Sequence, residues 1–172
     1  MNEQVIILTG EKQTGKTTFL QEWSEGRNDV AGLLTPVMDG KRCFYDIVKK
    51  EYFEMESASE SDRRLSVGKY FFLEEAFNNA ADRLLAMSTV ENINYLVIDE
   101  IGPLEIEKKQ GLYDCFIEIL DKPFQYVLIV IVRPTLIETI STIVDQHHKT
   151  SVVMTINELT EYLKTGVSKP AI

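Results

Sequence analysis

The hydrophobic and polar positions of the chain alternate between short apolar runs and longer amphipathic stretches. Apolar runs of the kind found in buried strands lie at 5–9, 30–34, 93–98, 125–132 and 151–154. Stretches with apolar residues at helical spacing lie at 16–25, 73–87, 111–120, 136–146 and 157–164. Strands and helices that alternate in this way predict an α/β fold with a mainly parallel sheet and helices on both faces.

The pattern changes between residues 36 and 72, where strand-like segments follow one another without a helix. Val37-Met38, the turn signal Asp39-Gly40 and the segment 42–48 predict a hairpin. A further strand is expected at 51–55, an exposed polar loop at 54–64 and a short strand or extended segment at 67–72. We therefore expect a β-hairpin insertion in an otherwise three-layer domain that spans 1–172.

The segment 10–17, which reads GEKQTGKT, fits the pattern G-x-x-x-x-G-K-[ST] of a phosphate-binding loop, or P-loop. It lies between a predicted strand and a predicted helix, as the motif requires. In such a loop backbone N–H groups surround the phosphates, Lys16 reaches the β- and γ-phosphates, and the Thr17 hydroxyl coordinates Mg²⁺. The residues expected to contact nucleotide are Gly10, Glu11, Lys12, Gln13, Thr14, Gly15, Lys16, Thr17 and Thr18.

A second candidate half of the site is the apolar strand at 95–98, which ends in Asp99 and Glu100. P-loop enzymes need an acid at the end of a neighbouring strand to hold Mg²⁺, and Asp99 fits that position. A second acid directly after it can orient or deprotonate the attacking water, and Glu100 fits that role. The alternative is that both acids cap a following helix. Ile101-Gly102-Pro103 follows, so we expect no helix there.

Composition limits the partners that the chain can have. The net charge is −9, from 18 basic and 27 acidic residues, so nucleic-acid binding is not expected. The longest apolar run, 126–132, is too short to span a bilayer, and the N-terminus lacks the basic region of a signal peptide. Cys43 and Cys115 are expected to be free thiols in a reducing cytosol, so we expect a cytoplasmic protein.

Several of these segments together resemble the small cancer-related nucleoside triphosphatase family. They are GEKQTGKTT from Gly10, the stretches at 32–35, 39–42, 45–47 and 67–70, and DEIGPLE from Asp99 to Glu105. The resemblance implies a RecA-like P-loop fold and Mg²⁺-dependent hydrolysis of ATP, GTP and other nucleoside triphosphates. It also implies that Glu105 supports Glu100 or a metal-bound water. This chain departs from the family at Pro36 and at Val132-Arg133, where the family often has Glu and a Thr-x-His-like end.

The resemblance also gives Arg133 a candidate role. In RecA-like sheets, the strand with the sensor residue lies between the loop strand and the acid strand, and the run at 125–132 is the candidate. Arg133, the first polar residue beyond it, would then stabilise charge on the γ-phosphoryl oxygens. The alternative is that Arg133, which precedes Pro134, points to solvent or pairs with a surface acid.

Two other functional classes share the P-loop. A nucleoside or nucleotide kinase would need an Arg-rich lid, but the chain has only six arginines and none of them are clustered after a helix as a lid. A slow, nucleotide-loaded regulatory module would also keep Lys16, Asp99 and Glu100. A switch GTPase is disfavoured because the chain has no N-K-x-D-like guanine reader. No sequence feature identifies a protein partner.

Overall fold

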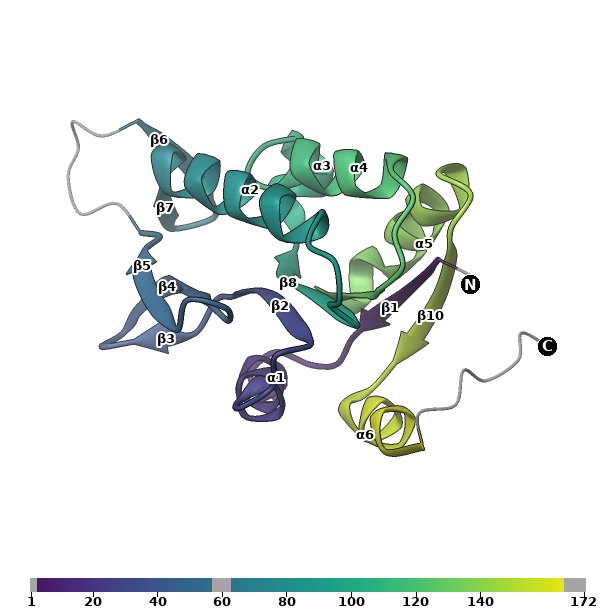
Figure 1. The fold of residues 1–172 in the computed structure, drawn as a ribbon. Coiled ribbons are helices and arrows are strands. Elements are labelled where there is room, and N and C mark those ends of the chain that lie inside the picture. Colours follow the sequence, from purple (N-terminus) through teal and green to yellow (C-terminus); the bar gives the residue numbers. More distant parts are fainter. Residues whose placement is uncertain (1–2, 57–62, 166–172) are drawn as a thin grey trace.

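The centre of the computed structural model, which describes residues 3–56 and 63–165, is a mixed sheet with helices on both faces (Figure 1). Its strand order is β10-β1-β9-β8-β2-β4-β3, with β5 paired to β4. The first five strands of this order are parallel. Their bounds are β1 Gln4–Leu8, β2 Val30–Leu34, β8 Tyr95–Ile101, β9 Val127–Val132 and β10 Thr150–Met154. The predicted α/β class with a mainly parallel sheet is confirmed.

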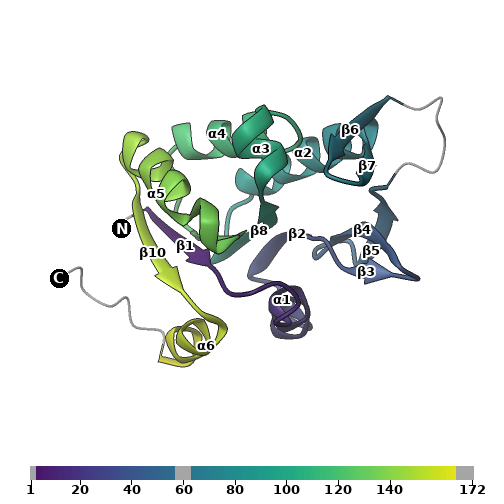
Figure 2. The ribbon, with the colours of Figure 1, turned by 180° about the vertical axis from the view of Figure 1, so that it is seen from behind.

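The helices form two layers, which Figures 1 and 2 show on opposite sides of the sheet. One layer contains α2 (Glu74–Ser88), α3 (Pro103–Lys108), α4 (Tyr113–Asp121) and α5 (Ile137–Gln146), the last preceded by the 3₁₀ turn η1 (Pro134–Leu136). The other layer contains α1 (Lys16–Ser24) and α6 (Ile156–Thr165). None of the helices in the described part of the chain is long and apolar enough to cross a bilayer.

The sheet is buried on both faces because successive side chains of its strands enter different core clusters. In β1, Val5 and Ile7 pack under the layer that contains α2, α4 and α5, whereas Ile6 and Leu8 pack with Leu20 of α1. This two-sided burial explains why the central strands read as unbroken apolar runs.

The insertion consists of two antiparallel units. Strands β3 (Val37–Met38), β4 (Lys41–Asp46) and β5 (Glu51–Glu54) extend the sheet, and β6 (Arg64–Val67) pairs with β7 (Tyr70–Leu73). The short strand or extended segment predicted at 67–72 is wrong as one continuous segment, because the chain turns at Gly68, whose φ of +57° favours glycine, and the range is divided between β6 and β7. The loop predicted at 54–64 lies partly outside the described residues, and Arg64 already begins β6.

The expectation that no helix begins after the acid pair is also wrong. Helix α3 starts at Pro103, directly after Gly102. Proline is favoured at the first helical position, because its missing N–H would have no helical partner there and its φ already suits a helix. The Glu105 carboxylate then accepts a 3.0 Å hydrogen bond from the Gly102 N–H and completes the helix start.

Candidate active site

The P-loop connects β1 to α1 as the motif requires. Gly15 precedes the first residue of α1 with φ of +82°, and Gly10 has φ of +150°, values that side-chain-bearing residues rarely adopt. Glu11, Lys12, Gln13, Thr14 and Thr18 are exposed. The two glycines therefore shape a loop whose outer side chains face solvent.

Lys16 folds back over the loop that carries it. Its Nζ donates hydrogen bonds to the backbone oxygens of Gly10 at 3.0 Å and Glu11 at 2.7 Å, and to the Thr14 hydroxyl at 3.1 Å. Three oxygen acceptors around one ammonium group are the kind of environment that phosphate oxygens can also provide. The loop therefore holds the lysine cation above its own backbone.

Thr17 and Asp99, which are 82 positions apart in the sequence, are in direct contact. The Thr17 hydroxyl donates a 2.7 Å hydrogen bond to Asp99 Oδ2, which also accepts the Thr35 backbone N–H at 3.0 Å. Asp99 is 3% exposed, and this burial raises the pKa of its carboxyl group. The fold therefore brings the two predicted metal ligands to one point.

A hydroxyl and a carboxylate fit Mg²⁺, which prefers oxygen ligands and usually takes only one or two from protein. Its other ligands are water and substrate phosphates. Within residues 3–56 and 63–165, no cluster of three or more His, Cys, Asp or Glu side chains could hold a metal by itself. The Thr17–Asp99 pair thus suits a metal shared with a nucleotide.

Glu100 lies between two arginines. Its Oε1 accepts a 2.6 Å hydrogen bond from Arg133 Nε, and its Oε2 lies 3.4 Å from Arg42 Nη1. The pairing of β8 with β9 is irregular between Ile98 and Ile101, the segment that contains both acids. Such irregularities re-aim side chains at the ends of strands. The result is a half-buried carboxylate with a guanidinium on each side.

Arg133 reaches Glu100 because β9 lies between β1 and β8. The order predicted for the loop strand, sensor strand and acid strand is therefore observed. The alternative of a solvent-pointing Arg133 does not hold, because its guanidinium pairs with Glu100 rather than with a surface acid. Its catalytic role stays a prediction.

Arg42 was not predicted as a site residue. It comes from β4 of the insertion, and 58 positions separate it from Glu100. Its backbone N–H is fixed by the Glu56 carboxylate at 2.8 Å. The only sequence signal was its place in the family-like stretch 39–42, because local patterns do not show contacts between distant segments.

Glu105 is buried on the α3 side of the site and is 4% exposed. Its two oxygens accept hydrogen bonds from the backbone N–H groups of Gly102 at 3.0 Å and Leu112 at 3.2 Å. Burial raises the pKa of its carboxyl group to about 7, against the lowering effect of these bonds. Both oxygens are thus engaged with backbone, which places Glu105 as a support for the segment that follows Glu100.

Two solved structures resemble this chain over nearly its whole length. THEP1 from Aquifex aeolicus superimposes with a TM-score of 0.67 at 20% identity, over 95% of this chain and 96% of that one. A human cancer-related nucleoside triphosphatase gives a TM-score of 0.64 at 19% identity, over 98% and 100% of the two chains. These likenesses confirm the three-layer P-loop NTPase fold.

Two curated proteins named nucleoside-triphosphatase THEP1 are similar in sequence. The protein from Saccharolobus solfataricus is 30% identical over 110 residues, which is 59% of this chain and 62% of that protein. The protein from Thermotoga sp. is 28% identical over 122 residues, or 69% and 67% of the two chains. The match thus spans a little less than two thirds of the first relative.

The sequence profile of a family described as NTPase matches residues 5–164, a range that includes every candidate site residue discussed above. This match bears out the family that DEIGPLE and the P-loop indicated. The chain therefore belongs to this NTPase family.

Proposed function

We propose that this chain hydrolyses nucleoside triphosphates to the diphosphate and phosphate with the help of Mg²⁺. One observation carries the proposal: the two successive acids at the end of β8 accept hydrogen bonds from different parts of the site. Asp99 accepts a hydrogen bond from the Thr17 hydroxyl of the P-loop, and Glu100 accepts one from the Arg133 guanidinium. This arrangement separates the position that suits a metal from the position that suits a base.

The P-loop would bind the phosphates. No side chain of the described residues caps α1, so the first N–H groups of this helix can donate to phosphate oxygens. Lys16 would exchange the loop oxygens of Gly10 and Glu11 for oxygens of the β- and γ-phosphates. This exchange keeps the ammonium group hydrogen-bonded in both states.

Thr17 and Asp99 would hold Mg²⁺ together with the phosphates. The ion would supply charge neutralisation at the β- and γ-phosphate oxygens as the bond from the γ-phosphorus to the β,γ-bridging oxygen breaks. The contribution of the chain is to keep its hydroxyl and carboxylate oxygens at one point before substrate arrives. The Thr35 N–H fixes the orientation of the Asp99 carboxylate.

Glu100 would take the proton of the attacking water. A carboxylate paired with two guanidinium groups is oriented by them, and its oxygens become free to accept a proton when those cations turn to another anion. The γ-phosphoryl group is such an anion. Arg133, and to a smaller extent Arg42, would then stabilise charge that develops on its oxygens.

The expected range of substrates follows from the parts of the nucleotide that the site would contact. The loop, Lys16 and the Thr17–Asp99 pair would all bind phosphate or the metal ion. The triphosphate group is the same in every nucleoside triphosphate. We therefore expect ATP, GTP and other triphosphates to be substrates. The free thiols Cys43 and Cys115 support a reducing, cytoplasmic compartment for this activity.

The test is phosphate release from ATP and Mg²⁺ alone, without an acceptor or a partner protein. The proposal predicts continuous phosphate release that stops when EDTA is added and returns when Mg²⁺ is restored. The Glu100→Gln variant serves as the control for a contaminating phosphatase. Release that is equal in wild type and this variant would contradict the proposal.

A further inference from the structure

A pocket opens directly beside Glu100, on the side of the insertion. It encloses about 550 Å³ outside the protein atoms, counting the part that is open to solvent. Its inner wall is apolar and comes from β4, β7, α2 and the α3 region, with Phe44, Phe72, Phe77, Leu104 and Leu112. In Figure 1 the β6–β7 hairpin, which contributes Val67, Tyr70 and Phe72 to the lining, lies next to the start of α2.

The aromatic rings of this wall pack against one another. The Phe77 ring lies edge-on to Phe44 at a centroid distance of 5.2 Å, and 5.8 Å from Phe72. Tyr70, which is 43% exposed, adds a ring at the hairpin side. An apolar wall of this kind favours an aromatic or aliphatic body over a polar one.

The charged groups of the pocket belong to the candidate active site. Arg42, Asp99, Glu100 and Arg133 all contribute to its lining. Glu105 contributes too, but its two oxygens already accept backbone N–H bonds. A ligand in the pocket would therefore have an apolar end among the rings and a polar end beside Glu100.

The pocket lies outside the phosphate-binding loop, as the site of an attacking oxygen must. The leaving diphosphate would lie in the P-loop, and in-line transfer places the attacking oxygen on the opposite side of the γ-phosphorus. Within the described chain, no residue of the segment 10–17 lines the pocket. Asp99, which accepts a hydrogen bond from the Thr17 hydroxyl of the loop, lines the pocket beside Glu100, so an oxygen at the pocket mouth is a neighbour of the proposed base.

We propose that this pocket is an acceptor site for an aromatic alcohol, which receives the γ-phosphoryl group in place of water. The proposal rests on the proposed nucleotide site. The alcohol oxygen forms a bond to the γ-phosphorus while the bond from that phosphorus to the β,γ-bridging oxygen breaks. The hydroxyl proton passes to Glu100 and then to solvent. The products are a phosphate monoester and the nucleoside diphosphate, and no oxidant or reductant is needed.

The wall explains why the acceptor is an aromatic alcohol rather than a nucleoside. A nucleobase has several donors and acceptors on its edges, and a wall of phenylalanine and leucine side chains would leave them unpaired. A phenyl ring has no donors or acceptors that could be left unpaired there, and it would contact Phe72 and Phe77. The single hydroxyl remains at the mouth, where charged groups provide partners.

The experiment incubates the full chain with ATP, Mg²⁺ and millimolar benzyl alcohol, and follows phosphorus-containing products by ³¹P NMR. We expect benzyl phosphate beside inorganic phosphate, in a ratio that rises with the benzyl alcohol concentration. Toluene, which lacks the hydroxyl, should lower this ratio by competition and yield no phosphorylated product. The ratio does not depend on the total turnover, so a general loss of activity leaves it unchanged.

A matched pair of substitutions tests whether the ratio of benzyl phosphate to inorganic phosphate depends on the pocket. Val67 is partly buried in the lining, and Val67→Trp should lower the ratio at least tenfold by filling the space. Val90, which is 53% exposed and outside the lining, gives the control Val90→Trp, with an unchanged ratio.

The outcomes separate this inference from the proposed function. Inorganic phosphate without benzyl phosphate, or an equal ratio in both tryptophan variants, overturns the acceptor site and leaves hydrolysis standing. Neither product means that the nucleotide site itself has been misassigned, and the acceptor site falls with it. Benzyl phosphate without inorganic phosphate supports the acceptor site and contradicts hydrolysis.

Discussion

The strands that carry the candidate phosphate and metal residues are built differently from those of the insertion. Four of the five residues of β1 and five of the seven residues of β8 are buried, whereas β3 and most of β5 are exposed. Two-sided burial fixes the backbone of the parallel strands, and with it the loop and the acids at their carboxyl ends. The insertion contributes Arg42 and part of the aromatic pocket wall to the site that the parallel strands position.

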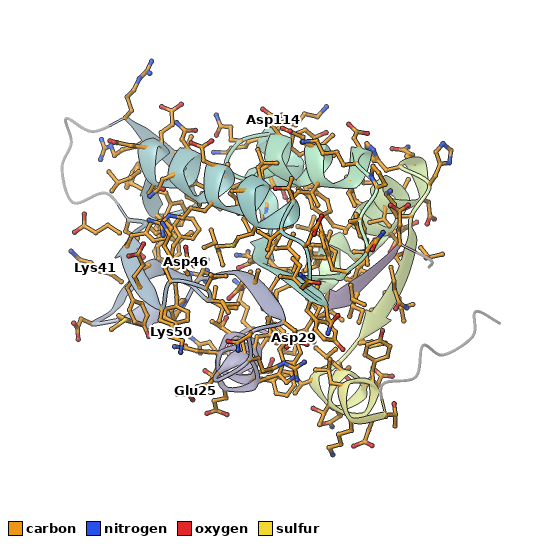
Figure 3. The ribbon with its side chains drawn as sticks, viewed as in Figure 1. Glu25, Asp29, Lys41, Asp46, Lys50 and Asp114 are labelled. Atoms are coloured by element: carbon orange, nitrogen blue, oxygen red, sulfur yellow. The ribbon has the colours of Figure 1, made fainter. Side chains whose placement is uncertain are left out.

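The insertion is joined to the helical layer by an ion pair as well as by packing. Asp46, at the end of β4, is fully buried, and its Oδ2 lies 2.8 Å from Arg83 Nη1 of α2 (Asp46 is labelled in Figure 3). Its other oxygen accepts the backbone N–H groups of Val48 and Lys49. Arg42 and the aromatic wall are thereby held against the parallel region, although they belong to a more exposed part of the molecule.

The comparison predicts that the largest loss of activity follows a change in the parallel region. Lys16→Ala removes the cation that would meet the β- and γ-phosphates, and kcat/KM for ATP should fall by about a hundredfold to a thousandfold. Circular dichroism and thermal unfolding should remain those of wild type, because the hydrogen bonds of Lys16 within the described residues go to its own loop. Activity within twofold of wild type would contradict the proposal that the P-loop binds the phosphates.

Discrimination between bases should be weak, because the parallel region addresses phosphates and no guanine-reading motif was found in the sequence. Discrimination of many orders of magnitude needs buried polar groups that the wrong substrate leaves unpaired. We expect kcat/KM values for ATP, GTP, CTP and UTP to lie within about a hundredfold of one another. A preference above about a thousandfold, measured by phosphate release, would require a base-reading element outside the phosphate loop.

Arg133 and Arg42 contact the same carboxylate from the two regions, so their variants compare the regions directly. Arg133→Ala should lower kcat by about tenfold or more with nearly constant KM, because the contact strengthens in the transition state. Arg42→Ala should cost less, since its guanidinium lies 3.4 Å from Glu100 rather than 2.6 Å. Arg133→Lys tests whether charge alone suffices. Equal kcat in wild type and Arg133→Ala would contradict the catalytic role of Arg133 and leave Arg42, another subunit or a partner as the source of any catalytic arginine.

Glu105 should affect stability more than turnover. Its folded pKa of about 7 lies above the ordinary value of 4.5, so the folded state binds the proton more tightly. Its contribution is fully present below about pH 4.5 and is lost as the pH rises to about 7, by at most about 3 kcal/mol. Urea unfolding at pH 5 and pH 8 should show a larger fall for wild type than for Glu105→Gln. Parallel falls would mean that burial does not raise this pKa.

The sequence predicted the parallel region far better than the insertion. Strand-like runs and the P-loop are local signals. Thr17 and Asp99 could be paired because P-loop enzymes hold Mg²⁺ with the Ser or Thr of the loop and an acid at the end of a neighbouring strand. Arg42 could not be placed, because its contact with Glu100 depends on how a hairpin folds over the sheet edge. The sequence does not predict helix α3, because Gly102-Pro103 is typical of a break in the chain, although proline also favours the first position of a helix.

The most direct test of the account is the Glu100→Gln variant, because Glu100 lies where the two regions meet. Glutamine keeps the size of the side chain and removes its basicity, while the P-loop and the Thr17–Asp99 pair are unchanged. Binding of ATP with Mg²⁺, measured by calorimetry, should remain near the wild-type affinity, and single-turnover hydrolysis should slow by about a hundredfold or more. Asp99→Asn should show the opposite pattern, a loss of Mg²⁺-dependent binding. The same defect in both variants, or unchanged hydrolysis in Glu100→Gln, would contradict the division of roles proposed for the two acids.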